Sequence, residues 1–110
     1  MNTFKQRGGG EIGGFYNSWP FGSITVSAGS LTVSALKRVT FTPDEVIAVE
    51  PFGWIPILWE GVRIHHKKTG CAEYVRFFSP HRTPLLNAIA AAGFPIGKYD
   101  PWTRRVTLLE

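Results

Sequence analysis

Residues 23–36 read Ser-Ile-Thr-Val-Ser-Ala-Gly-Ser-Leu-Thr-Val-Ser-Ala-Leu, with apolar and polar side chains alternating on both sides of one glycine. A period of two is typical of strands that have one buried and one solvated face. Gly29-Ser30 fits the two-residue turn of a hairpin, because glycine adopts the positive φ that the first central position requires. This register sets three apolar pairs on one face: Ala28 opposite Leu31, Val26 opposite Val33, and Ile24 opposite Ala35. The segment therefore predicts a β-hairpin with one face in the core.

Further strand patterns follow, and then one helix. The strand patterns lie at residues 39–41, 46–50, 61–67 and 72–78. Thr83 is the predicted N-cap of the helix, with Pro84 at the first helical position and Gly93 after its last turn. A helix of about nine residues is marginal alone in water, so we expect its apolar side chains to dock on the strands. These side chains are Leu85, Leu86, Ile89 and Ala92.

Length and composition indicate one ordinary domain. The chain has 110 residues, of which 44% are hydrophobic and 18% are charged, as in soluble globular proteins. Residues 1–14 contain two glycine runs and are predicted to be a flexible leader, because glycine loses much conformational entropy on folding. The predicted domain spans residues 15–96. Residues 97–110 are predicted to be a tail, with an added strand at 106–109 and a disordered end as the two alternatives.

Cysteine content and hydropathy favour a cytoplasmic location. Cys71 is the single cysteine, so it excludes an internal disulfide and fits a reducing compartment. No apolar run approaches the roughly 20 residues that span a bilayer, and residues 1–14 lack a hydrophobic signal segment. The net charge of +4 is spread along the chain, so charge alone does not indicate nucleic acid.

Several motifs in the second half of the chain point to a family. They are Gly61-Val62-Arg63-Ile64-His65-His66, Val75-Arg76-Phe77-Phe78, Ser79-Pro80, Leu85-Leu86 and Ala92-Gly93-Phe94. With these motifs, residues 17–94 resemble the bacterial pleckstrin-homology-like (PH-like) domains. The resemblance implies a mainly β (α+β) fold, in which two nearly orthogonal antiparallel sheets are capped by one C-terminal helix. The core expected in that fold consists of Ile24, Val26, Val33, Phe41, Ile64, Val75, Phe77, Leu85, Leu86 and Ile89.

The same resemblance implies a non-catalytic module that binds proteins, lipids or other copies of itself. Phosphoinositide-binding PH domains hold the headgroup with basic residues around the first hairpin loop. If residues 24–36 form that hairpin, its loop is Gly29-Ser30, which carries no cation. Phosphate recognition needs converging cations or N–H donors, so a specific phosphoinositide is not expected.

Residues 51–59, Pro-Phe-Gly-Trp-Ile-Pro-Ile-Leu-Trp, are nearly all apolar. Gly and Pro interrupt the segment, so it is predicted to be a loop, although loops normally face solvent. Tryptophan is enriched at interaction hot spots and at membrane interfaces. Three interpretations stay open: the loop closes the barrel mouth, it binds a protein or a second copy, or it inserts shallowly into a membrane. Its candidate binding residues are Trp54, Ile55, Ile57, Leu58 and Trp59.

A basic cluster follows this loop and completes the candidate binding set. The cluster consists of Arg63, His65, His66, Lys67 and Lys68, and its candidate binding residues are Arg63, His65, Lys67 and Lys68. One interpretation is a solvated strand edge, where lysine discourages pairing with other sheets, and the other is contact with an anion or nucleic acid. Tyr74 beside Arg63 and Arg76 is the patch that a single-strand binder would use, because such proteins stack bases on aromatic rings near cations.

Catalysis, metals and cofactors are not expected. His65 and His66 point to opposite faces of a strand, so they cannot ligate one metal without further ligands. Cys71 has no evident group to orient a catalytic base, and the acids show no paired spacing. The sequence predicts a binding or scaffold module that acts through protein–protein contact or self-association. The alternatives are a small β-rich nucleic-acid-binding protein and, third, a peripheral membrane-surface binder.

Overall fold

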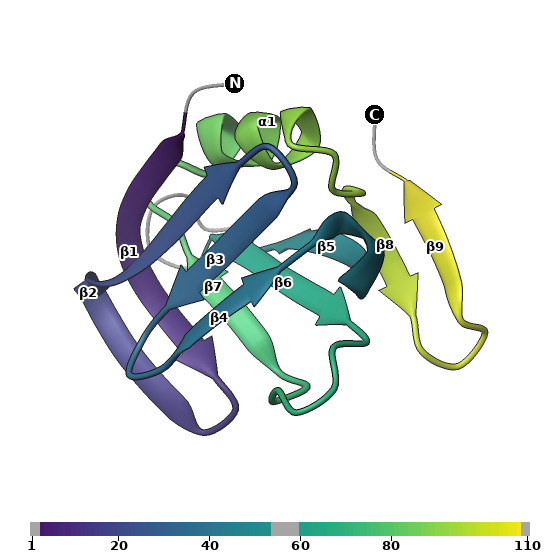
Figure 1. Ribbon diagram of the computed structural model, residues 1–110, viewed down its shortest axis with the longest axis horizontal. Helices are drawn as coiled ribbons and strands as arrows, with labels where there is room; N and C mark the ends of the chain where they lie inside the picture. The colour runs from purple at the N-terminus through teal and green to yellow at the C-terminus, as the bar shows by residue number, and fades with distance from the viewer. Residues whose placement is uncertain (1–2, 54–59, 109–110) are drawn as a thin grey trace.

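A computed structural model describes residues 3–53 and 60–108, and it is mainly β. Seven strands form one curled antiparallel sheet in the order β4-β3-β2-β1-β7-β6-β5, and two more strands form a small second sheet. One helix lies across one end of the curled sheet (Figure 1). The elements are β1 (Phe4–Ile12), β2 (Phe15–Ser27), β3 (Ser30–Ser34), β4 (Arg38–Phe41), the 3₁₀ turn η1 (Pro43–Glu45), β5 (Val46–Phe52), β6 (Gly61–His66), β7 (Val75–Phe78), α1 (Arg82–Ala91), β8 (Gly97–Asp100) and β9 (Arg105–Leu108).

The predicted hairpin is present as β2 and β3, with its register moved by two residues. Val26 pairs with Leu31 and Ile24 pairs with Val33, so the turn is Ala28-Gly29 instead of Gly29-Ser30. Gly29 has φ of +70° and occupies the second central position, as in a type II turn. A shift of two residues keeps every side chain on its face. The predicted core face is therefore confirmed for Ile24, Val26, Leu31 and Val33. The predicted pairing is wrong, and Ala28 lies in the turn, where it is exposed.

The predicted flexible leader at residues 1–14 is wrong, because β1 runs through the middle of the sheet. It pairs with β2 on one side and with β7 on the other. Gly8, Gly9 and Gly10 are buried there, and a Cβ built on Gly8 would lie 2.1 Å from the carbonyl oxygen of Phe78. The glycines thus provide space where strands pass closely, and a bulge between Gly8 and Gly10 accompanies the bend.

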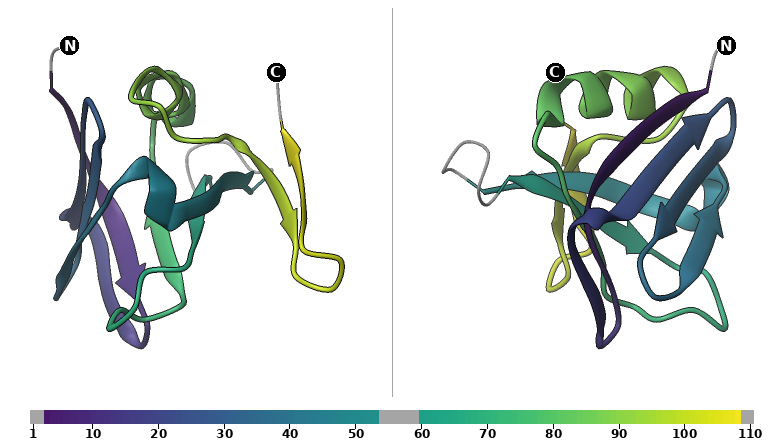
Figure 2. Two further views of the ribbon diagram at one scale, coloured as in Figure 1. Left: turned by 45° about the vertical axis from the view of Figure 1, so that its right-hand side comes forward. Right: turned by 90° about the vertical axis from the view of Figure 1, so that its left-hand side faces the viewer.

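The expected pair of sheets is one continuous hydrogen-bonded sheet. Its two halves, β1–β4 and β5–β7, are joined because β1 pairs with both β2 and β7. Figure 2 shows how the sheet curls so that its two halves face each other beneath α1. The expectation of separate sheets left β1 out, and β1 is the strand that connects them.

The structure largely confirms the predicted core. All of its members are buried except Leu86, which is half-buried. The helix begins at Arg82, with His81 as N-cap and no side-chain cap, and not after a Thr83 cap. Pro84 falls within the first turn, where backbone N–H groups have no partner in the helix.

The predicted tail forms a hairpin of β8 and β9 that lies against β5. The backbone N–H of Tyr99 donates to Glu50 Oε1 at 3.0 Å, and Val49 N–H donates to the carbonyl oxygen of Pro95 at 2.8 Å. β9 lies on the outside, with every one of its residues exposed (Figure 1). Among the described residues, no helix combines the length and apolarity needed to cross a membrane. The cytoplasmic location stays a prediction.

Candidate binding surface

The outer face of β1, β7, β6 and β5 carries a row of charged side chains. Because apolar residues of these strands point into the core, their neighbours along each strand point out. Strand register then sets Glu11 beside Arg76, Arg76 beside Arg63, and Arg63 beside Glu50. Two arginines therefore stand side by side between two glutamates.

Aromatic rings surround these arginines. The guanidinium carbons of Arg63 and Arg76 lie 4.6 and 4.7 Å from the ring centroid of Tyr74. Arg76 also lies 5.0 Å from the ring of Phe78 and 5.6 Å from that of Phe52. Cation–π contacts of this kind hold a guanidinium plane in place. We call Tyr16, Phe52, Arg63, Tyr74, Arg76 and Phe78 the aromatic–arginine face.

Glycines opposite the phenylalanines shape this face. Gly61 lies between Phe78 and Phe52 in the strand register, and a Cβ on Gly61 would lie 2.8 Å from the Phe52 ring. The two rings meet edge to face with centroids 5.5 Å apart. The small residue thus allows both rings to lie along the sheet surface.

A second group of aromatic residues is exposed on β2. The exposed fractions are 44% for Phe15, 54% for Tyr16, 63% for Trp19 and 75% for Phe21. Figures 1 and 2 show the β1–β2 turn at the end of the molecule opposite α1. Tyr16 meets Phe78 edge to face with centroids 6.0 Å apart, so Tyr16 connects β2 to the aromatic–arginine face. Phe15 pairs with Ile12 and lies under Lys37, on the other side of the strand.

The five predicted residues of the apolar loop, Trp54, Ile55, Ile57, Leu58 and Trp59, lie outside the described residues. The chain leading into that segment is held in place. Arg82 Nη1 donates to the carbonyl oxygens of Phe52 and Gly53 at 2.7 and 3.3 Å. Phe52 of the aromatic–arginine face belongs to the predicted loop 51–59, and the structure places it at the end of β5.

The predicted basic cluster is divided among separate environments. Arg63 belongs to the aromatic–arginine face, Lys67 is exposed, and His65 Nε2 lies 3.0 Å from Glu50 Oε1. Burial lowers the pKa of His65 below its ordinary 6.5, and this effect exceeds the opposing one of Glu50. At neutral pH the contact is therefore a hydrogen bond from a neutral imidazole rather than an ion pair.

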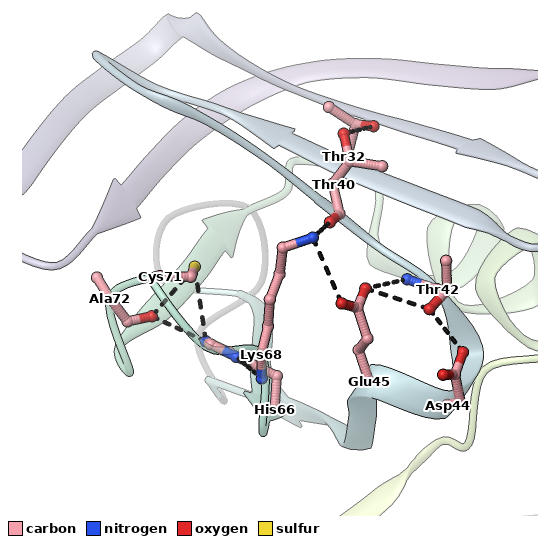
Figure 3. A network of polar contacts seen from close by, with 9 residues as sticks. All are labelled: Thr32, Thr40, Thr42, Asp44, Glu45, His66, Lys68, Cys71 and Ala72. Atoms are coloured by element: carbon pink, nitrogen blue, oxygen red, sulfur yellow. Dashed lines mark hydrogen bonds and ion pairs between the residues drawn. The ribbon is translucent and has the colours of Figure 1, made fainter.

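Lys68 takes part in a polar network that joins β4, η1 and the β6–β7 loop (Figure 3). Its Nζ donates to the carbonyl oxygen of Thr40 at 2.7 Å and lies 3.5 Å from Glu45 Oε2. Glu45 Oε1 accepts from the backbone N–H of Thr42 at 2.9 Å, and this bond lowers the pKa of Glu45. Lys68 therefore links two parts of the curled sheet.

The same network gives the histidine–cysteine pair a structural role. His66 Nδ1 accepts from the backbone N–H of Lys68 at 3.1 Å, and Nε2 donates to the carbonyl oxygen of Ala72 at 2.8 Å. Cys71 Sγ lies 4.0 Å from His66 Nε2, and burial raises the pKa of its thiol. A nucleophilic thiolate needs a lowered pKa and a free base, and this pair offers neither.

A hollow of about 360 Å³ lies beside this network and is lined by Lys37, Arg38 and Lys68 among others. The loop of the first hairpin in the structure, β1–β2, is Gly13-Gly14, and like Gly29-Ser30 it carries no cation.

In the hollow, Lys37 Nζ lies 4.2 Å over the Phe15 ring, and Arg38 Nε donates to Ser34 Oγ at 3.3 Å. Each cation of the hollow thus has a partner within the protein.

All four exposed aromatics of β2 were missed by sequence reasoning. Residues 15–21, Phe-Tyr-Asn-Ser-Trp-Pro-Phe, show no alternation, because neither face of this part of β2 is buried. That lack of alternation within a strand is the signal that could have found them.

Within residues 3–53 and 60–108, no three His, Cys, Asp or Glu side chains come together as a metal site. Comparison with protein-family models, with curated proteins and with solved structures finds no match to this chain. The chemistry of the surface therefore carries the functional inference.

Proposed function

We propose that this protein is a non-catalytic PH-like module that binds another protein or a second copy of itself through the exposed aromatics of β2 and the adjoining aromatic–arginine face. The PH-like assignment is supported by strands in hairpin order followed by one helix over the end of a curled sheet. The observation that carries the proposal is the run of four aromatic side chains on β2 that are 44–75% exposed.

Such a run favours a protein contact. Contiguous exposed apolar surface marks interaction sites, and Trp, Tyr and Arg are the residues most enriched at binding hot spots. Trp19 and Phe21 supply large apolar surface, and Arg63 and Arg76 supply cations held in place by Tyr74. The combination of rigid rings and fixed arginines suits a partner with a defined shape.

Nucleic acid is the second candidate, and the two arginines stacked on Tyr74 favour it. Single-strand binders combine aromatic platforms with a positively charged groove. The row on this face contains Glu11 and Glu50 as well as Arg63 and Arg76, so its net charge is zero. A protein partner therefore fits better than a polyanion. Shallow membrane docking stands third, since aromatic side chains also favour the lipid–water interface.

The test is affinity capture and light scattering with the wild-type chain and the variant Trp19→Ser/Phe21→Ser. The control is Trp102→Ser, because Trp102 is 94% exposed on the β8–β9 hairpin. We expect partner binding or self-association to weaken by at least about tenfold in the double variant, as for hot-spot residues, and to be retained in the control.

Three results would contradict the proposal. One is equal association by all three chains, and another is a monomer that captures nothing. The last is binding to vesicles or to oligonucleotides, instead of protein, that depends on Trp19 and Phe21.

A further inference from the structure

The pairing of β6 with β7 sets two like charges directly opposite each other. Arg63 and Arg76 are Cα partners and point to the same side of the sheet. Like charges at such positions destabilise a sheet, so each arginine needs an anion. What neutralises each one decides what this surface can bind.

Arg76 is neutralised within the protein and Arg63 is not. Arg76 donates through Nε and Nη2 to Glu11 Oε1, with the Nε bond at 3.0 Å. Glu50, the register neighbour of Arg63, instead accepts from His65 Nε2 and from the backbone N–H of Tyr99. Arg63 takes part in none of the ion pairs of the described residues.

The Nε atom of Arg63 is also buried, and within the described residues it has no hydrogen-bond partner. A buried donor on a charged group is costly to leave unpaired. Arg63 is therefore the arginine of this face whose donors the described residues satisfy least.

The geometry around Arg63 fits a planar anion. The guanidinium carbon of Arg63 lies over the Tyr74 ring, and its N–H groups lie in the guanidinium plane. Those in-plane donors match a carboxylate, which accepts two parallel hydrogen bonds from one arginine. The stacked ring fixes the plane beforehand, so less side-chain entropy is lost on binding.

We propose that Arg63, beside Arg76 and next to Tyr74, binds a single carboxylate of the partner, carried on a protein segment next to an aromatic side chain. This inference rests on the proposed function and names the chemistry of the partner. A single carboxylate would contact only the two arginines. A run of phosphates would also be repelled by Glu11 and Glu50 at the ends of the row. The neighbouring rings of Phe52 and Phe78 would receive the aromatic side chain.

The test uses two small probes and the whole chain. N-acetyl-tryptophan carries a free carboxylate and an indole ring, and N-acetyl-tryptophan amide is its neutral match. We follow the Nε–H signal of Arg63 and the backbone amides of Arg63 and Tyr74 by NMR titration. The acid is expected to bind in the millimolar range and to shift these signals saturably, with at least about tenfold weaker binding of the amide.

Two variants locate the effect. Arg63→Lys keeps the charge and loses the planar donors, so it is expected to weaken binding of N-acetyl-tryptophan by at least about tenfold. Arg7 is an exposed arginine of β1, and Arg7→Lys is the matched control. It is expected to leave binding of N-acetyl-tryptophan unchanged. Equal binding of both probes by the wild-type chain would overturn the inference, and this result does not depend on any variant folding.

The outcome is separable from that of the proposed function. Acid-selective binding at Arg63 with no effect of Trp19→Ser/Phe21→Ser on association would keep the carboxylate site and remove the protein-binding surface of β2. Partner binding that needs Trp19 and Phe21 but not Arg63 would keep the protein-binding surface of β2 and remove the carboxylate site. Binding of a thymidine oligonucleotide that weakens steeply with salt and needs Arg63 would replace the carboxylate with phosphate.

Discussion

Close packing of backbones explains several glycines of this chain. A Cβ on Gly8 would lie 2.1 Å from the carbonyl oxygen of Phe78, and one on Gly22 would lie 2.7 Å from the backbone nitrogen of Gly10. Real Cβ atoms do not approach backbone so closely, and backbone cannot move aside as the end of a flexible side chain can. These positions tolerate no side chain.

Gly8→Ala is therefore expected to destabilise the protein by about 1–3 kcal/mol, or to prevent folding, because overpacking forces the strands apart. Gly14→Ala is the control, since a Cβ there meets nothing within 4 Å. The free energy of unfolding in urea measures both. Equal stability of the two variants would show that β1 does not pass β7 as closely as described.

Sequence alone misassigned Gly8–Gly10 for a physical reason. Glycine both loosens a free chain and permits close approach in a packed one, and the neighbouring residues do not distinguish the two. Alternation, by contrast, correctly set Arg63, Tyr74 and Arg76 near one another, because side-chain direction in a strand follows from sequence position.

At the level of elements, the register between two strands was harder to predict than the face of the sheet on which each side chain lies. The β2–β3 hairpin keeps the same core face in two registers that differ by two residues. The observed one is fixed by tertiary contact: the N–H of Gly29 donates to the carbonyl oxygen of Ala92 at 3.3 Å. No local pattern within residues 23–36 contains that contact with the end of α1.

The attachment of the β8–β9 hairpin to the sheet makes stability depend on pH. The rings of His65 and Tyr99 lie 5.2 Å apart, and Glu50 bonds to both residues. Burial lowers the pKa of His65 below 6.5, so the unfolded chain binds this proton more readily than the folded chain. Stability is then present above pH 6.5 and is lost as pH falls below that value.

The expected result is a free energy of unfolding that declines between about pH 7 and pH 5, with a smaller decline in His65→Gln. His81→Gln replaces an exposed histidine and is the control, which should keep the wild-type slope. Urea unfolding at each pH gives the free energies. If His65→Gln keeps the full slope, another group is responsible.

In the whole molecule, β1 is the strand on which the sheet depends. It separates β2 from β7 in the seven-stranded order, and Ile12 lies in the core at 2% exposure. Removing it would leave two strands with unpaired backbone groups in the middle of the sheet. The β9 strand, by contrast, has only exposed residues.

A chain lacking residues 1–12 is therefore expected to be unfolded, whereas a chain lacking residues 101–110 should keep its fold, with a melting temperature lowered by only a few degrees, about what 1 kcal/mol corresponds to. Far-ultraviolet circular dichroism and NMR dispersion measure both. A folded chain without residues 1–12 would restore the leader that the sequence first predicted.

The central place of β1 also sets an order of events during synthesis. The strand is synthesised well before one of its partners, β7, which lies at Val75–Phe78, so the sheet stays open until β7 has been made. Contacts between such distant parts of a chain form slowly. Until then the aromatic residues of β2 and an unpaired strand border are available to other nascent chains, and a holding chaperone has a natural target there.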